Sequence, residues 1–196
     1  MKLVLFRHGA TAWSVTGRHT GRTDLPLTDA GRAEARSAEP LMRRVLGEGW
    51  PGRVVTSPLG RAVETARLVF PETASEQDDD LVEMDYGRFE GLTLEQIREG
   101  RPGWDLWRDG CPGGETVQDV ARRADSFLAS IAGETQPVTA VAHGHLIRIL
   151  AARALALRAD QGQLFGVGTA TASCIEDIRG QPVVTLWNLS PSLAPR

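Results

Sequence analysis

The sequence has little cysteine and no hydrophobic run long enough to cross a membrane. Only two of the 196 residues are cysteines, Cys111 and Cys174, and they form no C-x-x-C pair. This excludes a disulfide framework, a redox pair and a cysteine-rich metal site, and predicts two free thiols. No apolar run approaches the roughly 20 residues that span a bilayer, so no membrane partner is expected.

An excess of charge of one sign is also missing. The formal net charge is -3 at pH 7, from 22 basic and 25 acidic side chains, and no basic run with interleaved aromatic residues occurs. Nucleic acid is therefore not expected as a partner. The first residues, MKLVLF, have neither the apolar length nor the cleavage site of a signal peptide, which predicts a cytoplasmic location.

What is present is the composition of an ordinary globular protein, 41% hydrophobic and 24% charged. A chain of this length can bury a full core without disulfides or metal ions, so we expect one domain over residues 1–196. The acidic stretch SEQDDD at 75–80 is predicted to be a solvated loop. The composition does not decide the oligomeric state, and a homodimer stays open.

Short β-branched and aliphatic runs alternate with helical patterns. Strands are predicted at 2–6, 53–56, 138–142, 172–178 and 182–187, the last two as a hairpin. Helices are predicted at 28–46 with a kink at Pro40, at 58–69, from Val117 to Ile131, and at 145–157. The alternation predicts an α/β fold, a three-layer α/β/α sandwich around a central, mostly parallel sheet.

Polar residues gather where three of these strands end. The first strand runs into Arg7, His8 and Gly9, the second is followed by Arg61, and the third is followed by His143. Ligands of α/β proteins bind at the carboxyl ends of the strands. A single histidine after a strand is more often an ordinary polar residue, but two histidines and two arginines together predict a pocket for a phosphoryl group. Glycine after the histidine would allow close backbone approach.

Five segments, taken together, resemble the histidine phosphatase superfamily, which includes cofactor-dependent phosphoglycerate mutases and many phosphatases. They are RHG at 7–9, TGRTDLPLTDAGRAEA at 20–35, TSPLGRAVETA at 56–66, LVEMDYGRFEG at 81–91 and VAHGHLIR at 141–148. The resemblance covers about residues 2–150 in the family's order. It implies a metal-independent phosphomonoesterase that needs no cofactor and acts on small phosphorylated metabolites.

The resemblance implies a role for each of five residues. His8 is the nucleophile that becomes a phosphohistidine, and Glu83 gives a proton to the leaving oxygen. Arg7, Arg61 and His143 bind the phosphoryl oxygens. Covalent catalysis by an imidazole divides one difficult displacement into two easier ones, and arginine forks suit the oxygens because they stay charged and donate in pairs.

Further residues are implied in binding the substrate and its phosphate: Ser14, Thr20, Gly21, Gly144 and His145. The HGH pair could be read as metal ligands, but no third ligand is clustered with it, so no metal is expected. Two roles stay open for His19, a solvated loop residue or a substrate contact. The same holds for Trp104 and Trp107, which could staple a lid to the body or contact the substrate.

Departures from the mutase pattern favour a phosphatase. Mutases of the superfamily carry Glu-Arg-x-Tyr-Gly, in which the arginine grips the substrate carboxylate, and here Met84 replaces that arginine. Ser14 stands where asparagine is usual, and the lid insertion, about 84–115, is short. Without a basic segment to hold a bisphosphate cofactor, water should hydrolyse the phosphohistidine. The alternatives are a phosphoglycerate mutase, a protein phosphatase and a non-catalytic binder of phosphorylated ligands.

Several motifs resemble the sugar-phosphatase branch that includes sedoheptulose-bisphosphatase-like enzymes. They are W-S at 13–14, TG-TDLPLT at 20–28, E-x-x-YG-x-x-EG at 83–91 and W-x-x-W-RDGCPGGE at 104–115. Phosphosugars are therefore the leading substrate class. One hypothesis places a second phosphate, or the sugar hydroxyls, on Arg22, Arg88, Arg108 and His145, although exposed arginines are usually only solvated.

Overall fold

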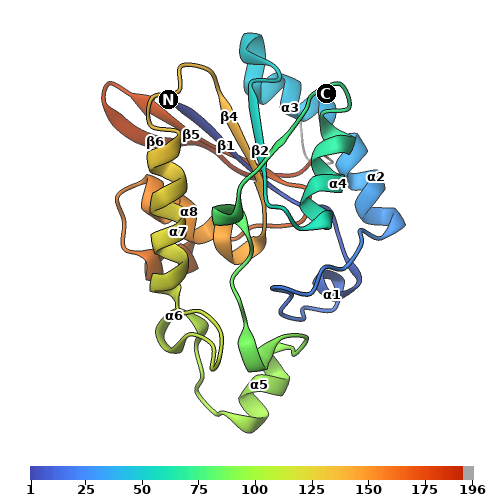
Figure 1. Cartoon of the computed structure of the whole chain (residues 1–196), viewed down its shortest axis with the longest axis vertical. Coiled ribbons are helices and arrows are strands. Elements are labelled where there is room, and N and C mark those ends of the chain that lie inside the picture. Colours follow the sequence, from blue (N-terminus) through green and yellow to red (C-terminus); the bar gives the residue numbers. More distant parts are fainter. Residues whose placement is uncertain (192–196) are drawn as a thin grey trace.

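A six-stranded β-sheet forms the middle of the molecule (Figure 1), in a computed structural model that describes residues 1–191. Residues 192–196, the end of the predicted domain, lie outside the described residues. Across the sheet the order is β3-β2-β4-β1-β5-β6. The strands are β1 (Lys2–Arg7), β2 (Arg53–Thr56), β3 (Glu76–Gln77), β4 (Val138–Ala142), β5 (Ala172–Ile178) and β6 (Gln181–Leu189).

The sheet is mostly parallel, as predicted. Strands β3, β2, β4 and β1 pair in parallel. Strand β5 runs antiparallel to β1 and forms the predicted C-terminal hairpin with β6. The carboxyl ends of β2, β4 and β1 therefore meet at one edge, which faces α1 (Ala12–Val15) in Figure 1.

Helices cover both faces of the sheet because strand side chains alternate between them. In β1, Leu3 and Leu5 belong to one buried cluster, whereas Val4 and Phe6 belong to the other. The first cluster includes α7 (Val117–Ser130) and α8 (Gly144–Ala154), and the second includes α2 (Asp29–Ser37), α3 (Glu39–Leu46) and α4 (Gly60–Val69). The predicted three-layer sandwich is confirmed.

Several predicted helix boundaries differ from the structure. The segment 28–46 forms two helices, α2 and α3, and Pro40 lies in the first turn of α3, where its missing N–H is not needed. Helix α4 begins at Gly60 rather than at 58, because Leu59 is extended. Helix α8 ends at Ala154 rather than at 157, and Ala156 beyond it has a left-handed backbone with φ 57°.

The acidic stretch at 75–80 is not entirely a loop. Its centre forms β3, a two-residue edge strand whose Glu76 is in register with Val55 of β2. The side chains of β3 are exposed, so only backbone pairing shows that it is a strand. The segment then passes through η2 (Asp79–Leu81) toward Glu83.

The segment 84–115 contains η3 (Gly87–Phe89), α5 (Leu94–Gly100) and α6 (Leu106–Asp109). Helices α5 and α6 lie at the lower end of the view in Figure 1, beyond the carboxyl ends of the strands. The remaining short elements are η1 (Gly47–Gly49) and η4 (Ala159–Leu164). Within residues 1–191, every helix is too short or too polar to span a bilayer.

Candidate active site

The central histidines lie at the carboxyl ends of β1 and β4. Arg7, the last residue of β1, is in register with Ala142, the last residue of β4. The residues that follow, His8 and His143, are therefore neighbours, with ring centroids 5.1 Å apart. Arg7 and His8 line a cavity of about 190 Å³. The strand ends meet as the sequence predicts.

His8 presents a free ring nitrogen to this cavity. Its Nδ1 lies 2.7 Å from the carbonyl oxygen of Gly9, and because a carbonyl only accepts, Nδ1 carries the proton. The lone pair is then on Nε2. Burial, with help from the positive charges of Arg7 and Arg61, holds the pKa of His8 well below 6.5. His8 is therefore neutral near pH 7, the form in which Nε2 is a nucleophile.

His143 is fixed in the opposite tautomer. Arg61 donates from Nε to Nδ1 of His143 over 3.2 Å, and arginine cannot accept a hydrogen bond. Burial is the main cause that holds the pKa of His143 well below 6.5, followed by the charges of Arg61, His8 and Arg7. The neutral ring therefore carries its proton on Nε2, which makes that atom a donor.

Two buried nitrogens beside His8 lack a partner among the described residues. They are Nε of Arg7 and Nε2 of His143. An unsatisfied buried donor costs about 1–3 kcal/mol, so such atoms favour a bound acceptor. Arg7 is held in place by its other end, where Nη1 donates to the carbonyl of Val167 over 2.7 Å. The arrangement suits an anion whose oxygens accept from both nitrogens.

Arg61 lies beneath the cavity rather than in its lining. Its side chain is fully buried, and Nη1 donates to the carbonyl of Thr23 over 2.8 Å. Nη2 donates to the carbonyls of Thr20 and Gly21. Most of its N–H groups are thus used within the protein, and its charge acts on the histidines beside it. Direct contact of Arg61 with a phosphoryl oxygen stays a prediction.

Glu83 lines the same cavity and is held by the first turn of α8. Its Oε2 accepts from the backbone N–H of His145 over 3.0 Å, and its Oε1 accepts from the N–H groups of Leu146 and Met84. Helix N-termini favour carboxylates in this way because their first N–H groups are otherwise unpaired. The carboxylate is therefore fixed beside His8 by backbone alone.

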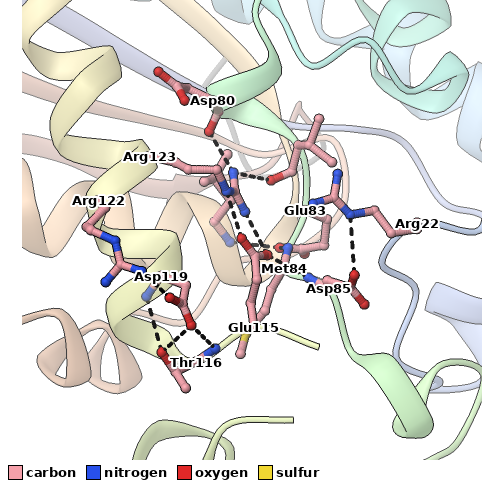
Figure 2. A network of polar contacts seen from close by, with 12 residues as sticks. Arg22, Asp80, Glu83, Met84, Asp85, Glu115, Thr116, Asp119, Arg122 and Arg123 are labelled. Carbon is pink, nitrogen blue, oxygen red and sulfur yellow. Dashed lines mark hydrogen bonds and ion pairs between the residues drawn. The ribbon is translucent and has the colours of Figure 1, made fainter. Parts of the chain in front are cut away.

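A second set of contacts holds the backbone on both sides of Glu83 (Figure 2). Arg123 of α7 donates from Nη1 to the carbonyls of Asp80 and Val82. Its Nε and Nη2 donate to the two carboxylate oxygens of Glu115. Glu115 in turn accepts from the N–H of Asp85 over 2.8 Å. Glu83 thus lies on an extended segment that Arg123 fixes before it and Glu115 fixes after it.

The other predicted binding residues divide into two groups. Ser14, Thr20, Gly144 and His145 line the cavity, although the Ser14 hydroxyl is engaged in capping α1. A Cβ on Gly144 would lie 3.3 Å from Cζ of Arg7, so glycine lets that guanidinium pack closely on α8. Gly21 does not line the cavity, and its N–H is taken by the Glu90 carboxylate. A role for Gly21 in phosphate binding has no support in this geometry.

Several cavity residues were not identified as site residues from the sequence: Gly17, Arg18, Tyr86, Arg148 and Val167. Tyr86 had a signal, because it stands in the motif that contains Glu83. It is buried, and its hydroxyl shares a hydrogen bond of 2.6 Å with Nδ1 of His145. Arg148 had a weaker signal, its place one helical turn after His145. His19, left open above, also lines the cavity, with its ring stacked on that of His145.

Two sequence hypotheses need correction. Gly9 permits a close approach, but of the chain to itself: a Cβ there would lie 2.4 Å from the carbonyl oxygen of Gly31 in α2. The arginines proposed for a second phosphate do not line the cavity. Arg22 is half exposed and lies 3.8 Å from Asp85, Arg108 pairs with Asp109, and Arg88 lines a separate surface groove.

The two lid tryptophans are packing residues in this structure. Trp104 is buried, and its indole N–H donates to the carbonyl of Gly110 over 2.9 Å. Trp107 packs against His145, with ring centroids 5.5 Å apart. Neither lines the cavity. In the part of the chain that the structure describes, no group of three or more His, Cys, Asp or Glu residues could hold a metal ion.

Comparison with known families agrees with this geometry. The sequence profile of the histidine phosphatase superfamily (branch 1) matches residues 3–190. The chain belongs to this family. The resemblance inferred from the five segments is thus confirmed, and it extends over the C-terminal hairpin as well.

Similar proteins of this histidine phosphatase include both phosphatases and mutases. An acid phosphatase of Mycobacterium tuberculosis is 42% identical over 87% of this chain and 83% of its own length. Sedoheptulose 1,7-bisphosphatase of Saccharomyces cerevisiae is 35% identical over 77% of this chain and 66% of its own length. A mycobacterial glucosyl-3-phosphoglycerate phosphatase solved with vanadate superimposes with a TM-score of 0.85 at 33% identity, covering 96% of this chain and 99% of that one. A 2,3-bisphosphoglycerate-dependent phosphoglycerate mutase of Gloeobacter violaceus is 36% identical over 76% of this chain and 73% of its own length.

Replacing Arg123 of the histidine phosphatase with alanine is expected to lower kcat about tenfold. The change removes the hydrogen bonds, here called the Arg123 clamp, that hold the backbone before Glu83. It also leaves Glu115 without its main partner, which should lower the free energy of unfolding by about 1–3 kcal/mol. Because the clamp acts through Glu83, the loss should be larger for an alkyl phosphate than for p-nitrophenyl phosphate, whose leaving group needs little protonation. A purely structural role would lower both rates equally.

The neighbouring Arg122 provides a matched control for this experiment. It lies on the same helix, its side chain is 73% exposed, and it pairs with Asp119 (Figure 2). Arg122→Ala is expected to leave both rates and the melting temperature near those of the parent protein. If the two substitutions changed the rates equally, the proposed role of Arg123 in holding the backbone before Glu83 would be wrong.

The pH dependence should reflect the lowered pKa values of the buried histidines. His8, His143 and His145 all have pKa values held well below 6.5, chiefly by burial. With p-nitrophenyl phosphate, whose leaving group needs no proton from Glu83, we expect kcat/KM to be flat from pH 8 to 6.5 and to fall only at lower pH, once corrected for titration of the substrate. An acid limb centred above pH 6.5 would contradict a neutral His8.

The free energy of unfolding should also decrease at low pH, because of the same lowered histidine pKa values. Below pH 6.5 the unfolded chain binds protons at these histidines that the folded chain does not bind, so the free energy of unfolding decreases as pH falls from 6.5 toward the folded pKa values. Chemical denaturation at pH 7.5, 6.5 and 5.5 measures this. Replacing His145 with glutamine should reduce the dependence, because one of the three groups is then absent.

Proposed function

We propose that this chain is a metal-independent phosphomonoesterase that works through a phosphohistidine on His8. The observation that carries the proposal is the neutral His8, whose free Nε2 faces a cavity beside two buried donors without partners. A nucleophile and an anion cradle are thus assembled before substrate binds. Preorganised donors of this kind are the main source of catalysis in phosphoryl transfer.

The first chemical step would form a bond between Nε2 of His8 and phosphorus while the bond from phosphorus to the leaving oxygen breaks. Glu83, in its protonated form, gives its proton to that oxygen, and the alcohol departs. The N–H groups at Arg7 Nε and His143 Nε2 donate hydrogen bonds to the phosphoryl oxygens and stabilise the charge that develops on them. Arg61 adds positive charge from beneath.

In the second step water attacks the phosphohistidine. The Glu83 carboxylate removes the proton from water as the new oxygen–phosphorus bond forms. The bond from phosphorus to Nε2 breaks, and its electron pair returns to the ring. Inorganic phosphate leaves, and His8 and Glu83 regain their starting forms.

Hydrolysis is favoured over mutase chemistry by the residue after Glu83. Met84 is fully buried in the hydrophobic core, so it offers nothing to a substrate carboxylate at that position. The cavity is small and lined by polar side chains, which favours small phosphorylated metabolites over phosphoprotein segments. Two of the relatives named above are a sedoheptulose 1,7-bisphosphatase and a glucosyl-3-phosphoglycerate phosphatase, and we propose phosphosugars as the substrate class.

Two assays run side by side test the proposal. Phosphate release is measured from phosphosugars, phosphoglycerates and p-nitrophenyl phosphate without added metal, and a coupled assay follows conversion of 3-phosphoglycerate to 2-phosphoglycerate with 2,3-bisphosphoglycerate present. Phosphate release with little isomerisation supports the phosphatase. Efficient isomerisation without release would make the chain a mutase. If the protein shows neither activity, the remaining alternative is a non-catalytic binder of phosphorylated ligands.

Location and assembly are proposals of the sequence alone. We retain two expectations, a cytoplasmic location and one domain over residues 1–196; the composition and the ordinary length of the chain support the second. Homodimer formation stays untested. Light scattering on the purified protein would measure its mass in solution.

A further inference from the structure

Arg148 carries a positive charge at the cavity that the proposed reaction does not use. It lies on α8, three residues after His145, and lines the cavity together with His8. Side chains three residues apart share one face of a helix, so both reach the same space. Among the described residues, no carboxylate lies within ion-pair distance of Arg148. A partly buried cation without a counter-charge favours an anionic ligand.

The guanidinium of Arg148 is held in one orientation. Nε donates to the carbonyl of Gly162 over 3.2 Å and Nη2 donates to that of Gln163 over 3.0 Å, both in η4. Its Cζ lies 4.5 Å from the centroid of the Trp107 ring. These contacts leave Nη1 without an acceptor among the described residues, and they hold the side chain before any ligand arrives.

The cavity lining carries more positive than negative side chains. Apart from three histidines and Tyr86, its ionisable lining residues are Arg7, Arg18 and Arg148 against a single carboxylate, Glu83. Arg7 is assigned to the phosphoryl group, whereas the side chain of the exposed Arg18 donates, among residues 1–191, only to the carbonyl of Gly91. Arg148 is half-buried, and this burial lowers the pKa of its guanidinium. A substrate dianion held at His8 leaves this second positive region uncompensated.

We propose that Arg148, oriented by Trp107, binds a second anionic group at the end of the substrate away from the transferred phosphoryl group. The inference rests on the proposed phosphatase function and narrows its substrates to phosphate esters that carry another phosphate or a carboxylate. Arg18 at the rim adds charge to the same subsite. The sequence hypothesis of a second phosphate site is thereby moved from Arg22, Arg88 and Arg108 to Arg148.

Matched substrate pairs test this subsite. Fructose 1,6-bisphosphate is compared with fructose 6-phosphate, and 3-phosphoglycerate with glycerol 3-phosphate, by initial rates of phosphate release. Each pair differs mainly in the second anion. For the parent protein, kcat/KM should be at least tenfold higher for the member with two anionic groups in one pair or both. The pair that shows the preference identifies phosphate or carboxylate as the group bound.

Arg148→Gln should reduce that preference about tenfold or more, mainly through KM, whereas Arg148→Lys should keep part of it because the charge remains. Arg153→Gln is the matched control, since Arg153 lies on α8 and pairs with Asp125 outside the cavity. It should keep the parent preference. If Arg148 only supported η4, its replacement would lower both members of each pair equally, and an unchanged preference would overturn the proposal.

The two proposals fail in different ways. If the parent protein releases no phosphate from any of these esters or from p-nitrophenyl phosphate, the phosphatase assignment fails. If it releases phosphate but shows no preference within either pair, the phosphatase assignment stands and the Arg148 subsite is wrong.

Discussion

Replacing His8 with alanine is expected to reduce phosphate release by at least about 10⁴-fold, because the free ring nitrogen beside the two unpartnered donors of Arg7 and His143 is then absent. His143 cannot substitute, since its Nδ1 accepts from Arg61 and its Nε2 carries the proton. The His8 side chain is 4% exposed and neutral, so its removal leaves a small cavity and no unpaired charge. The melting temperature should change by only a few degrees.

Trapping the intermediate makes this test specific. The parent protein, quenched during turnover, should carry phosphate in an acid-labile linkage, and His8→Ala should carry none. Binding of inorganic phosphate, measured by thermal shift, checks that the alanine protein still folds around its anion site. Activity above about 1% of the parent rate in the alanine protein would show that a different nucleophile acts.

Glu83→Gln is the second substitution with a large expected effect. Loss of the proton donor should lower kcat for alkyl phosphates such as phosphosugars by about 10²–10⁴-fold. The loss should be much smaller for p-nitrophenyl phosphate in the first step, because nitrophenolate departs without a proton. The size of the leaving-group dependence therefore measures how far Glu83 acts as an acid.

Glutamine at position 83 keeps one carbonyl oxygen for the backbone N–H groups of Met84 and Leu146, but turns an amide toward that of His145. Some loss of stability is expected, so the comparison is made at a temperature where both proteins are folded by circular dichroism. An equal loss for alkyl and aryl substrates would mean that Glu83 only shapes the site.

That the candidate site residues gather at one sheet edge was predictable from the sequence, because they follow strand ends. An apolar run that stops at Arg7 and His8, and another that stops at His143, place these residues at one sheet edge once the strands are parallel neighbours. This inference uses only the apolar runs and the geometry of a parallel sheet.

Element boundaries were less predictable because distant residues decide them. Helix α4 begins at Gly60, whose N–H donates to the carboxylate of Asp24 from another segment. Strand β3 exists through backbone pairing with β2, which its exposed acidic side chains do not reveal. No periodic pattern in the sequence encodes either contact.

The sequence by itself determined the family, the layered fold and the residue types at the candidate site. Only the tertiary structure decided which ring nitrogen carries the proton in His8 and in His143, because the Gly9 carbonyl and Arg61 fix opposite tautomers. It also placed Arg148 at the cavity and Arg61 beneath it, although both are arginines near strand ends. Those differences depend on carbonyl oxygens and ring faces supplied by segments far apart in the chain, which no local pattern specifies.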